Sequence, residues 1–163
     1  MLFARTGYDA VNSNQIARQA GVGVGTFYRH FVDKQALADA LRLQVWEQLG
    51  LHMPPWDEAS PARFGRAATE AIVDFAVAHP EPFRAAFGGM RTAKMQLSLR
   101  PIERRFRELI EAGAAREGLE PAVAARAWWS MISGTVVWWL EDPSRTTRQE
   151  LVDTLAALHP ASG

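Results

Sequence analysis

NQIARQAGVGVGTFYRHFVDKQAL, residues 14–37, is the stretch that decides how the first third of this chain folds. Its first half carries the apolar residues Ile16, Ala17 and Ala20 at the spacing of a helix face. Asn12, which stands just before the stretch, belongs to the residue types that cap helix N-termini. The pattern predicts a short helix that begins near residue 13.

Two glycines interrupt that helix, and a second helix follows them. Gly21 and Gly23 favour a turn, because glycine ends helices readily and adopts turn conformations without steric cost. Phe27 and Phe31 then restore the four-residue spacing of a helix. The stretch is therefore predicted to form two short helices joined by a tight turn.

A longer helix and a linker come next. Asp33 is predicted to cap a helix that continues to about Leu51, with leucine and valine repeating every four residues along one face. The segment HMPPWDEASP, residues 52–61, contains prolines, which cannot donate helix hydrogen bonds. We place the domain boundary there, between a first domain over residues 1–51 and a second over residues 60–159.

The second domain is predicted to be helical throughout. Its apolar spacing, prolines and glycines indicate helices over residues 62–78, 83–87, 97–117, 122–141 and 145–158. No segment has the strict alternation of a strand. The expected fold class is all-α.

The composition narrows the classes of function. The 163 residues include no cysteine, which excludes disulfides, thiolate metal sites and cysteine nucleophiles and fits a reducing cytoplasm. No apolar run is long enough for a membrane span, and the start does not resemble a signal peptide. The 18 basic and 18 acidic residues cancel, so charge alone does not indicate a nucleic-acid binder. We expect a cytoplasmic protein without a membrane partner.

Residues 14–37 resemble the DNA-binding signature of the TetR family of transcriptional regulators. The match combines an Ile-Ala pair, a glycine turn, a Gly-Thr-Phe-Tyr core, a closing phenylalanine and a lysine shortly before Ala-Leu. The resemblance implies a three-helix-type helix-turn-helix domain for double-stranded DNA, followed by a helical effector-binding and dimerisation domain. It further implies a repressor that binds a palindromic operator as a homodimer, responds to a small hydrophobic effector and needs no cofactor.

In this interpretation the second short helix enters the major groove, where each base pair shows a distinct edge. By match to the family pattern, the residues near base edges are Asn14, Gln15, Val24 and Gly25. The residues expected on phosphates are Thr26, Tyr28, His30 and Lys34. Arg29 suits either a phosphate or a guanine edge. Tyr28 and His30 are also open to a second interpretation, in which they only pack the helix against its neighbour.

The chain departs from the family pattern in two places. Gly23 and Val24 stand where the family has a polar residue and then a lysine, which weakens the helix cap and removes a contact. The family's first helix is also longer, and only Met1 to Thr6 match its last part, so Leu2 and Phe3 look like core residues without their helix. Either the start lies upstream, or the domain is truncated.

Large apolar residues of the second domain are candidates for an effector cavity, although such residues more often simply form a core. The candidates are Phe75, Phe83, Phe87, Met90, Met95, Phe106, Trp128 and Met131. The helix over residues 122–141 is apolar over much of its circumference around Trp138 and Trp139, which suggests cover by a second subunit. A dimer through the last two helices would place two reading helices about one DNA turn, ~34–36 Å, apart.

Two other functions compete with regulation. Catalysis would need a recognisable site, but the four histidines form no metal-binding pair, and no local Ser-His-Asp motif is recognisable. We therefore expect neither an enzyme nor a metal site. The second alternative is a helical module that binds a small molecule or a protein, in which the truncated helix-turn-helix no longer binds DNA.

Overall fold

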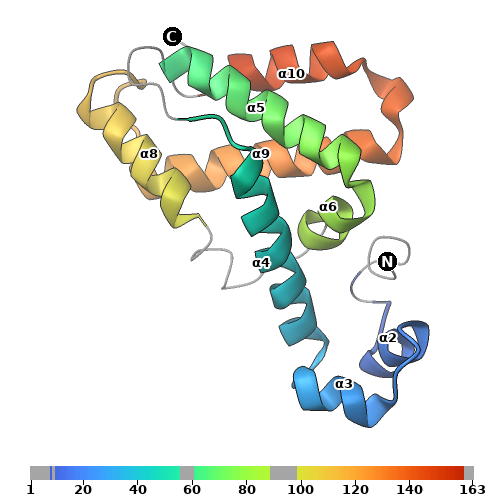
Figure 1. Ribbon diagram of the computed structural model, residues 1–163. Coiled ribbons are helices and arrows are strands. Elements are labelled where there is room, and N and C mark those ends of the chain that lie inside the picture. The colour runs from blue at the N-terminus through green and yellow to red at the C-terminus, as the bar shows by residue number, and fades with distance from the viewer. Residues whose placement is uncertain (1–7, 9, 56–60, 89–98, 160–163) are drawn as a thin grey trace.

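The computed structural model describes residues 8, 10–55, 61–88 and 99–159 of the chain. All regular structure in these ranges is helical (Figure 1), which confirms the expected all-α class. The helices are α2 (Ser13–Gln19), α3 (Val24–His30), α4 (Lys34–His52), α5 (Pro61–Ala78), α6 (Pro80–Phe87), α8 (Arg100–Glu111), α9 (Pro121–Glu141), the 3-10 turn η1 (Pro143–Arg145) and α10 (Arg148–Ala157). Four residues singled out above lie outside the described residues: Leu2, Phe3, Met90 and Met95.

Capping explains where α2 begins and ends. Asn12 Oδ1 accepts from the N–H of Gln15 at 3.0 Å, and Gln15 Oε1 accepts from the N–H of Asn12 at 2.9 Å, which completes a capping box. At the other end Gly21 has φ 69°, in the left-handed region. The N–H groups of Gly21 and the next residue bond back to carbonyls of the last helical turn. The turn between α2 and α3 therefore depends on a glycine.

The weak cap predicted for α3 is confirmed, because Gly23 is its N-cap and makes no side-chain hydrogen bond. Packing holds α3 instead. Phe27 is only 5% exposed, and its ring contacts those of Tyr28 and Phe31 at centroid distances of 5.3 and 5.8 Å. On the neighbouring α2, Ala17 is fully buried. A small apolar core therefore fixes the two short helices against each other.

The long helix α4 joins the two parts of the molecule. Asp33 caps it by accepting from the N–H of Ala36 at 2.7 Å, and the helix ends one residue beyond the expected Leu51. In Figure 1, α4 runs from α2 and α3 at one end of the molecule into the group of helices at the other. Val45 and Leu49 enter the core there. We call α2 and α3 the head, and the helices from α5 to α10 the body.

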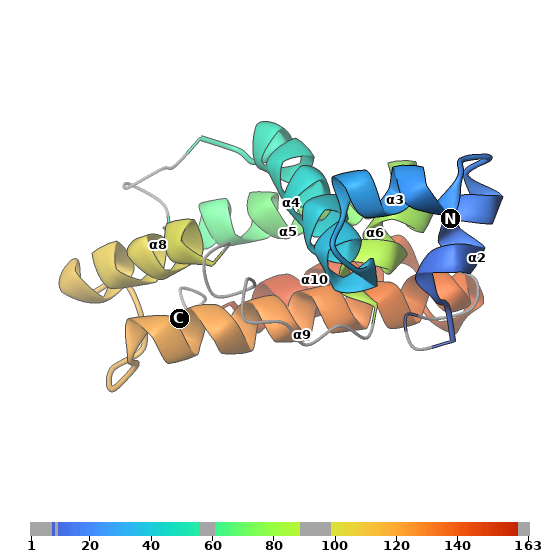
Figure 2. The same ribbon diagram turned by 90° about the horizontal axis from the view of Figure 1, so that it is seen from below.

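The body is built around α9. Figures 1 and 2 show α9 crossing the body, and it contacts α5, α6 and α8. α10 packs beside α5, on the side of α5 that faces away from the head. Phe83, Trp129 and Ile132 are at most 2% exposed in the core between these helices. The removal of these large side chains from water is the main force that holds the body together.

The prediction of a helix over residues 97–117 is wrong at its C-terminal end. α8 ends at Glu111, because Gly113 adopts φ 65° and closes the helix. The N–H of Gly113 bonds to the carbonyl of Ile110, and the next N–H bonds to the carbonyl of Leu109. The apolar spacing continued beyond residue 111, but the glycine C-cap determined where the helix stops.

The last helix also begins later than residue 145. Asp142 first holds η1 by accepting from the backbone N–H of Ser144 at 3.1 Å. Thr147 and Glu150 then form a new capping box, so α10 begins at Arg148. Short polar side chains that bond to nearby backbone thus set this boundary.

Candidate functional site

The head presents one side of α3 to solvent. Its exposed residues are Val24, Gly25, Tyr28, Arg29 and His30. Val24 and Tyr28, one helical turn apart, are 43% and 51% exposed, although both have large apolar parts. Thr26 is half-buried. Five of the six α3 residues predicted at DNA therefore lie on an open surface.

A hollow of about 380 Å³ opens between the start of α2, α3 and the start of α4. Asn14, Tyr28 and Lys34 are among the residues that line it, so the structure brings together three residues predicted at DNA. Gln15 is exposed nearby, but its side-chain oxygen already accepts the N–H of Asn12. Gln15 therefore holds the start of α2 whatever else it contacts.

Lys34 makes hydrogen bonds within the protein that the sequence did not indicate. Its Nζ donates to the carbonyls of Tyr8 and Val11, each at 2.9 Å, and lies 4.3 Å from the centroid of the Tyr8 ring. Two of the three N–H donors of this ammonium group are thus used within the protein. Lys34 therefore links the chain before α2 to the start of α4.

A chain of hydrogen bonds runs along α4 from the head to the body. Tyr8 Oη donates to Gln35 Oε1 at 2.7 Å, and Gln35 Nε2 donates to Asp39 Oδ1 at 3.1 Å. Arg42 Nη1 donates to the same Asp39 oxygen at 2.8 Å. Arg42 is 2% exposed, and its Nε donates to the carbonyl of Ala86 in α6 at 3.0 Å. These five residues connect the first described residue to α6.

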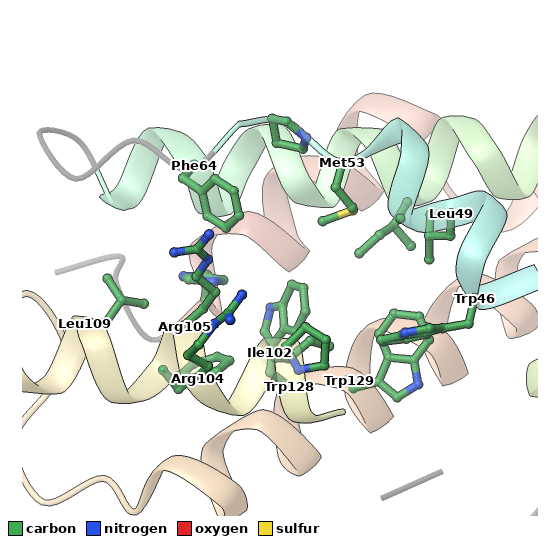
Figure 3. A pocket seen from close by; sticks show the side chains of 16 residues that line it. Trp46, Leu49, Met53, Phe64, Ile102, Arg104, Arg105, Leu109, Trp128 and Trp129 are labelled. Carbon is green, nitrogen blue, oxygen red and sulfur yellow. The ribbon is translucent and has the colours of Figure 1, made fainter. Parts of the chain in front are cut away.

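A cavity of about 290 Å³ lies in the body between α4, α5, α8 and α9 (Figure 3). Its apolar wall includes Trp46 and Leu49 of α4, Ile72 of α5, Ile102 of α8 and Trp128 and Trp129 of α9. The volume is at the lower end of the range for small-molecule sites, roughly 300–1,000 Å³. The body therefore holds an apolar space of the size of a small ligand.

Two arginines reach this cavity from α8. Figure 3 shows Arg104 and Arg105 extending from α8 toward α5, between Phe64 and Trp128. Arg105 Nη1 donates to Glu108 Oε2 at 2.6 Å, and Arg104 Nε lies 3.9 Å from the other oxygen of the same carboxylate. The carboxylate of Glu108 therefore pairs with both guanidinium groups, closely with Arg105 and loosely with Arg104.

His159, just after α10, also lines the cavity. Its ring is stacked on Phe106 at 5.7 Å and meets Trp128 edge-on at 5.4 Å. Gly65 makes room for it, because a Cβ at residue 65 would lie 2.7 Å from the imidazole. Burial lowers the pKa of His159 to about 4, since the charged form loses its hydration. The imidazole is therefore neutral near pH 7.

The structure divides the residues predicted for the effector. Phe106 and Trp128 line the cavity. Phe83 and Phe87 lie in the core, with their rings 4.9 Å apart, and Phe87 packs on Trp129 at 5.1 Å. Two of the other four residues are placed elsewhere: Phe75 lies beside a separate hollow with His52 and His79, and Met131 is half-buried against the core. The last two, Met90 and Met95, lie outside the described residues.

Sequence reasoning missed the polar part of this cavity. Arginine and glutamate alternate along α8 in a pattern typical of a solvated helix face, and this pattern conceals Arg104 and Arg105. His159 comes near the end of the sequence without any motif around it. Trp46 could have been recognised only as an aromatic residue on a helix that was expected to connect the domains.

One side of α9 is largely open within the described part of the chain, apart from Arg145, which lies 4.9 Å from the centroid of the Trp138 ring. Val123 and Trp138 are 65% and 46% exposed, and the small residues Ala127, Ser130 and Gly134 between them are exposed as well. A Cβ added at Gly134 would meet no atom within 4 Å. Small residues of this kind allow a second helix to approach closely, and the apolar ends favour its burial.

The described residues contain no group of three or more His, Cys, Asp or Glu side chains that could hold a metal ion. Among the helices of these same ranges, none is both long and apolar enough to cross a lipid bilayer. The candidate sites are therefore the open face of α3 and the cavity of the body.

Sequence comparisons match both parts of the chain. Residues 1–41 match the model of the bacterial regulatory proteins of the tetR family, and residues 66–159 match the tetracyclin repressor-like C-terminal domain. An HTH-type transcriptional regulator of Mycobacterium tuberculosis is 30% identical over 165 residues, covering 91% of this chain and 67% of the relative.

Solved structures match the fold over nearly the whole chain. A TetR family transcription regulator of Shewanella sp. PV-4 has a TM-score of 0.76 at 17% identity, covering 98% of this chain and 90% of that one. The regulator FadR of Bacillus subtilis, in complex with stearoyl-CoA, has a TM-score of 0.70 at 17% identity, covering 99% and 94%. At these identities the likeness concerns the fold alone.

Proposed function

Because the chain belongs to the TetR family of bacterial transcriptional regulators, we propose that it is a repressor, which binds a palindromic operator as a homodimer and responds to a small effector. The observation that carries the proposal is the position of α4. Its first residues border the open face of the head, and Trp46 and Leu49 near its other end line the cavity. A ligand in the cavity therefore contacts the helix that carries the head.

The start of α3 would contact base edges in the major groove. Val24 projects methyl groups that suit the C5-methyl of thymine, and Gly25 lets the backbone approach the bases. Asn14 and Gln15 at the start of α2 can pair with adenine. A valine at this place would contribute shape and apolar contact to the recognition of sequence.

The phosphates would be held around that face. The residues proposed to contact them are Thr26, Tyr28, Arg29, His30 and Lys34. Tyr28 and Lys34 line one hollow, so a single phosphate there would reach the phenol and the ammonium. Arg29 is exposed in the last turn of α3, where it can contact a phosphate or a guanine. Contacts of this kind fix the register of the head on the duplex.

The dimer would form through α9 and α10. The open side of α9, with Val123 and Trp138 at its ends and Gly134 between them, fits a self-complementary contact about a two-fold axis. Two heads about one DNA turn apart then match a palindrome. Each head alone offers few phosphate contacts, so useful affinity depends on both.

The effector would act by shifting a population. An apolar ligand in the cavity favours one position of α4 and hence one spacing of the two heads, which changes operator affinity. The FadR structure contains stearoyl-CoA, which shows that a protein of this fold holds a molecule with a long apolar chain. We propose regulation in the cytoplasm, without catalysis.

Fluorescence anisotropy of labelled duplexes from the gene's own upstream region, with a salt titration, tests this function. We expect binding at least roughly 1,000-fold tighter than to a scrambled duplex. Arg29→Gln should weaken binding and reduce the salt slope by about one. Arg107→Gln, an equally conservative change on exposed α8, should leave both unchanged. Weak binding that is equal for both duplexes would overturn the proposal in favour of a module that only binds a ligand.

A further inference from the structure

The cavity of the body combines an apolar wall with a one-sided set of polar groups. No acidic side chain lines it among the described residues, whereas Arg104 and Arg105 both do. Arg104 makes no hydrogen bond to the described residues, and its one ion pair, to Glu108, is long at 3.9 Å. A guanidinium carries five N–H donors and no acceptor. Arg104 therefore offers N–H donors and positive charge, for which the described residues supply only this distant carboxylate.

A second donor is buried at the same place. Trp128 is 6% exposed and lines the cavity, and its indole Nε1 has no hydrogen-bond partner in the described part of the chain. An indole N–H can only donate, and a buried donor without an acceptor is costly. In Figure 3 the indole of Trp128 lies beside the space that the two arginines enter. An oxygen of a ligand there would satisfy it.

The other end of the cavity has no comparable groups. In Figure 3 the side chains of Trp46, Leu49 and Trp129 lie on the side of the cavity away from the two arginines, and none of them bears a charge. His159 is neutral near pH 7 because it is buried, so the arginines are the only cations that line the cavity among the described residues. This lining matches a ligand that is apolar over most of its surface and negatively charged at one end.

From this arrangement we infer that the effector is a small carboxylic acid with an apolar body. Its carboxylate lies between Arg104, Arg105 and the indole N–H of Trp128, and its body lies against Trp46, Leu49 and Trp129. A guanidinium and a carboxylate form charge-assisted hydrogen bonds, which are the stronger kind. The inference rests on the proposed function for the ligand's role as an effector, but binding itself can be measured without DNA.

Isothermal titration calorimetry of the full chain with two matched pairs of probes tests this inference. The pairs are octanoate with 1-octanol, and 2-naphthoate with 2-naphthalenemethanol, so that each acid has a neutral partner of the same apolar body. We expect at least one acid to bind in the micromolar to sub-millimolar range and at least about tenfold more tightly than its alcohol. This ratio is typical of one charge-assisted hydrogen-bonded contact.

Substitutions in the cavity then show which side chains bind the carboxylate. Arg104→Gln should remove most of the preference for the acid while leaving the alcohol unchanged, since the arginine is largely exposed and its replacement does not disturb the core. Trp128→Phe keeps an aromatic ring and removes the N–H donor, so it should lower the affinity for the acid by a few-fold only. Arg107→Gln on the same helix, outside the cavity, should change neither ligand.

The inference would be overturned if the alcohols bound as tightly as the acids, or if Arg104→Gln lowered the binding of acid and alcohol equally. It would also fail if neither acid bound at millimolar concentration. If any of these results were found together with sequence-selective DNA binding by the same preparation, the carboxylic-acid inference would be refuted. The proposed function as a regulator would still stand. Tight acid binding without selective DNA binding would support the carboxylate site and refute the proposed function.

Discussion

The head and the body obtain their functional surfaces in different ways. The open face of the head and its hollow are formed by residues within 10–34, whereas the cavity is lined by residues between Trp46 and His159 that come from separate helices. A surface made by neighbours in sequence depends on caps, a glycine turn and helical spacing. A cavity made by distant residues depends on how whole helices pack. The two regions should therefore fail separately, and the following predictions test that separation.

The largest effect is expected from Phe27→Ala. Phe27 is the buried anchor of α3, and loss of such a ring costs about 3–5 kcal/mol. In a head of two short helices this cost should melt the reading surface, so we expect a loss of DNA affinity of about 1,000-fold or more. Anisotropy measures that loss. All six tryptophans follow residue 45 and none lies in α2 or α3, so tryptophan emission during urea unfolding does not report the head and should change little.

Val32→Ala provides the control for this change. Val32 follows the same helix but is 81% exposed, so its truncation should affect neither DNA binding nor the body. The loss of DNA affinity and the shift of the tryptophan unfolding transition can both be expressed as free energies. If the two were equal for Phe27→Ala, head and body would form one folding unit, and the contrast between them would be wrong.

The fold was largely predictable because its determinants are local. Asn12, Gly21 and Asp33 each cap or end a helix through bonds to residues within a few positions, and the sequence shows such residues directly. The helix expected over residues 83–87 in fact begins at Pro80, because prolines are tolerated in its first turn. Two further errors arose where a local bond overrode the apolar spacing. Gly113 ends α8 early, and the η1 turn delays α10. Both deviations lie in loops that join long helices.

The candidate sites were predictable to different extents for the same reason. The family pattern identified the exposed residues of α3, because they follow one another in sequence. The cavity requires knowledge of which helices meet. Gly65 and His159 are in contact across 94 positions, and no spacing rule indicates such a pair. Phe83 and Phe106 have the same chemistry and both lie in the core, but packing places only Phe106 at the cavity.

The second prediction concerns pH and separates the body from the head. The folded body holds His159 neutral down to a pKa of about 4, whereas an unfolded histidine binds a proton near pH 6.5. Between these values the unfolded state binds more protons, so stability falls as the pH falls. We expect a loss approaching about 3 kcal/mol between pH 7 and pH 4, measured by urea unfolding with tryptophan emission.

His159→Gln should flatten that profile, because the new side chain does not titrate. The variant is less stable than the wild type at pH 7, since its stacking on Phe106 is lost, and the difference should shrink toward pH 4. A profile that kept its slope in the variant would assign the pH dependence to other groups.

The third prediction is that DNA binding by the head depends on dimerisation through the body. Gly134→Arg places a long charged side chain on the open side of α9, where the protomer itself has open space. The protomer should keep its stability, while the dimer should dissociate and DNA affinity should fall about 100-fold, the lower range of gains from linking two sites. Sedimentation velocity measures the dimer. Gly134→Ala keeps the close approach possible, and a dissociated dimer in that variant as well would imply a more exacting contact than proposed.

The smallest effect is expected at the joint between the two regions. Arg42→Lys retains the charge beside Asp39, but a lysine cannot also reach the carbonyl of Ala86 in the manner of the guanidinium Nε. The hydrogen-bond chain from Tyr8 to α6 should break there at a cost of about 1–2 kcal/mol. Amide hydrogen exchange should become faster both in the head and in α6, because each loses a tether to α4. Arg107→Lys, on an exposed pair with Glu103, should cost less than about 0.5 kcal/mol and leave the exchange in both regions unchanged. If Arg42→Lys accelerated exchange in α6 alone, the hydrogen-bond chain would anchor α4 to the body but would not couple α4 to the head. Head and body would then be more independent of each other than these hydrogen bonds indicate.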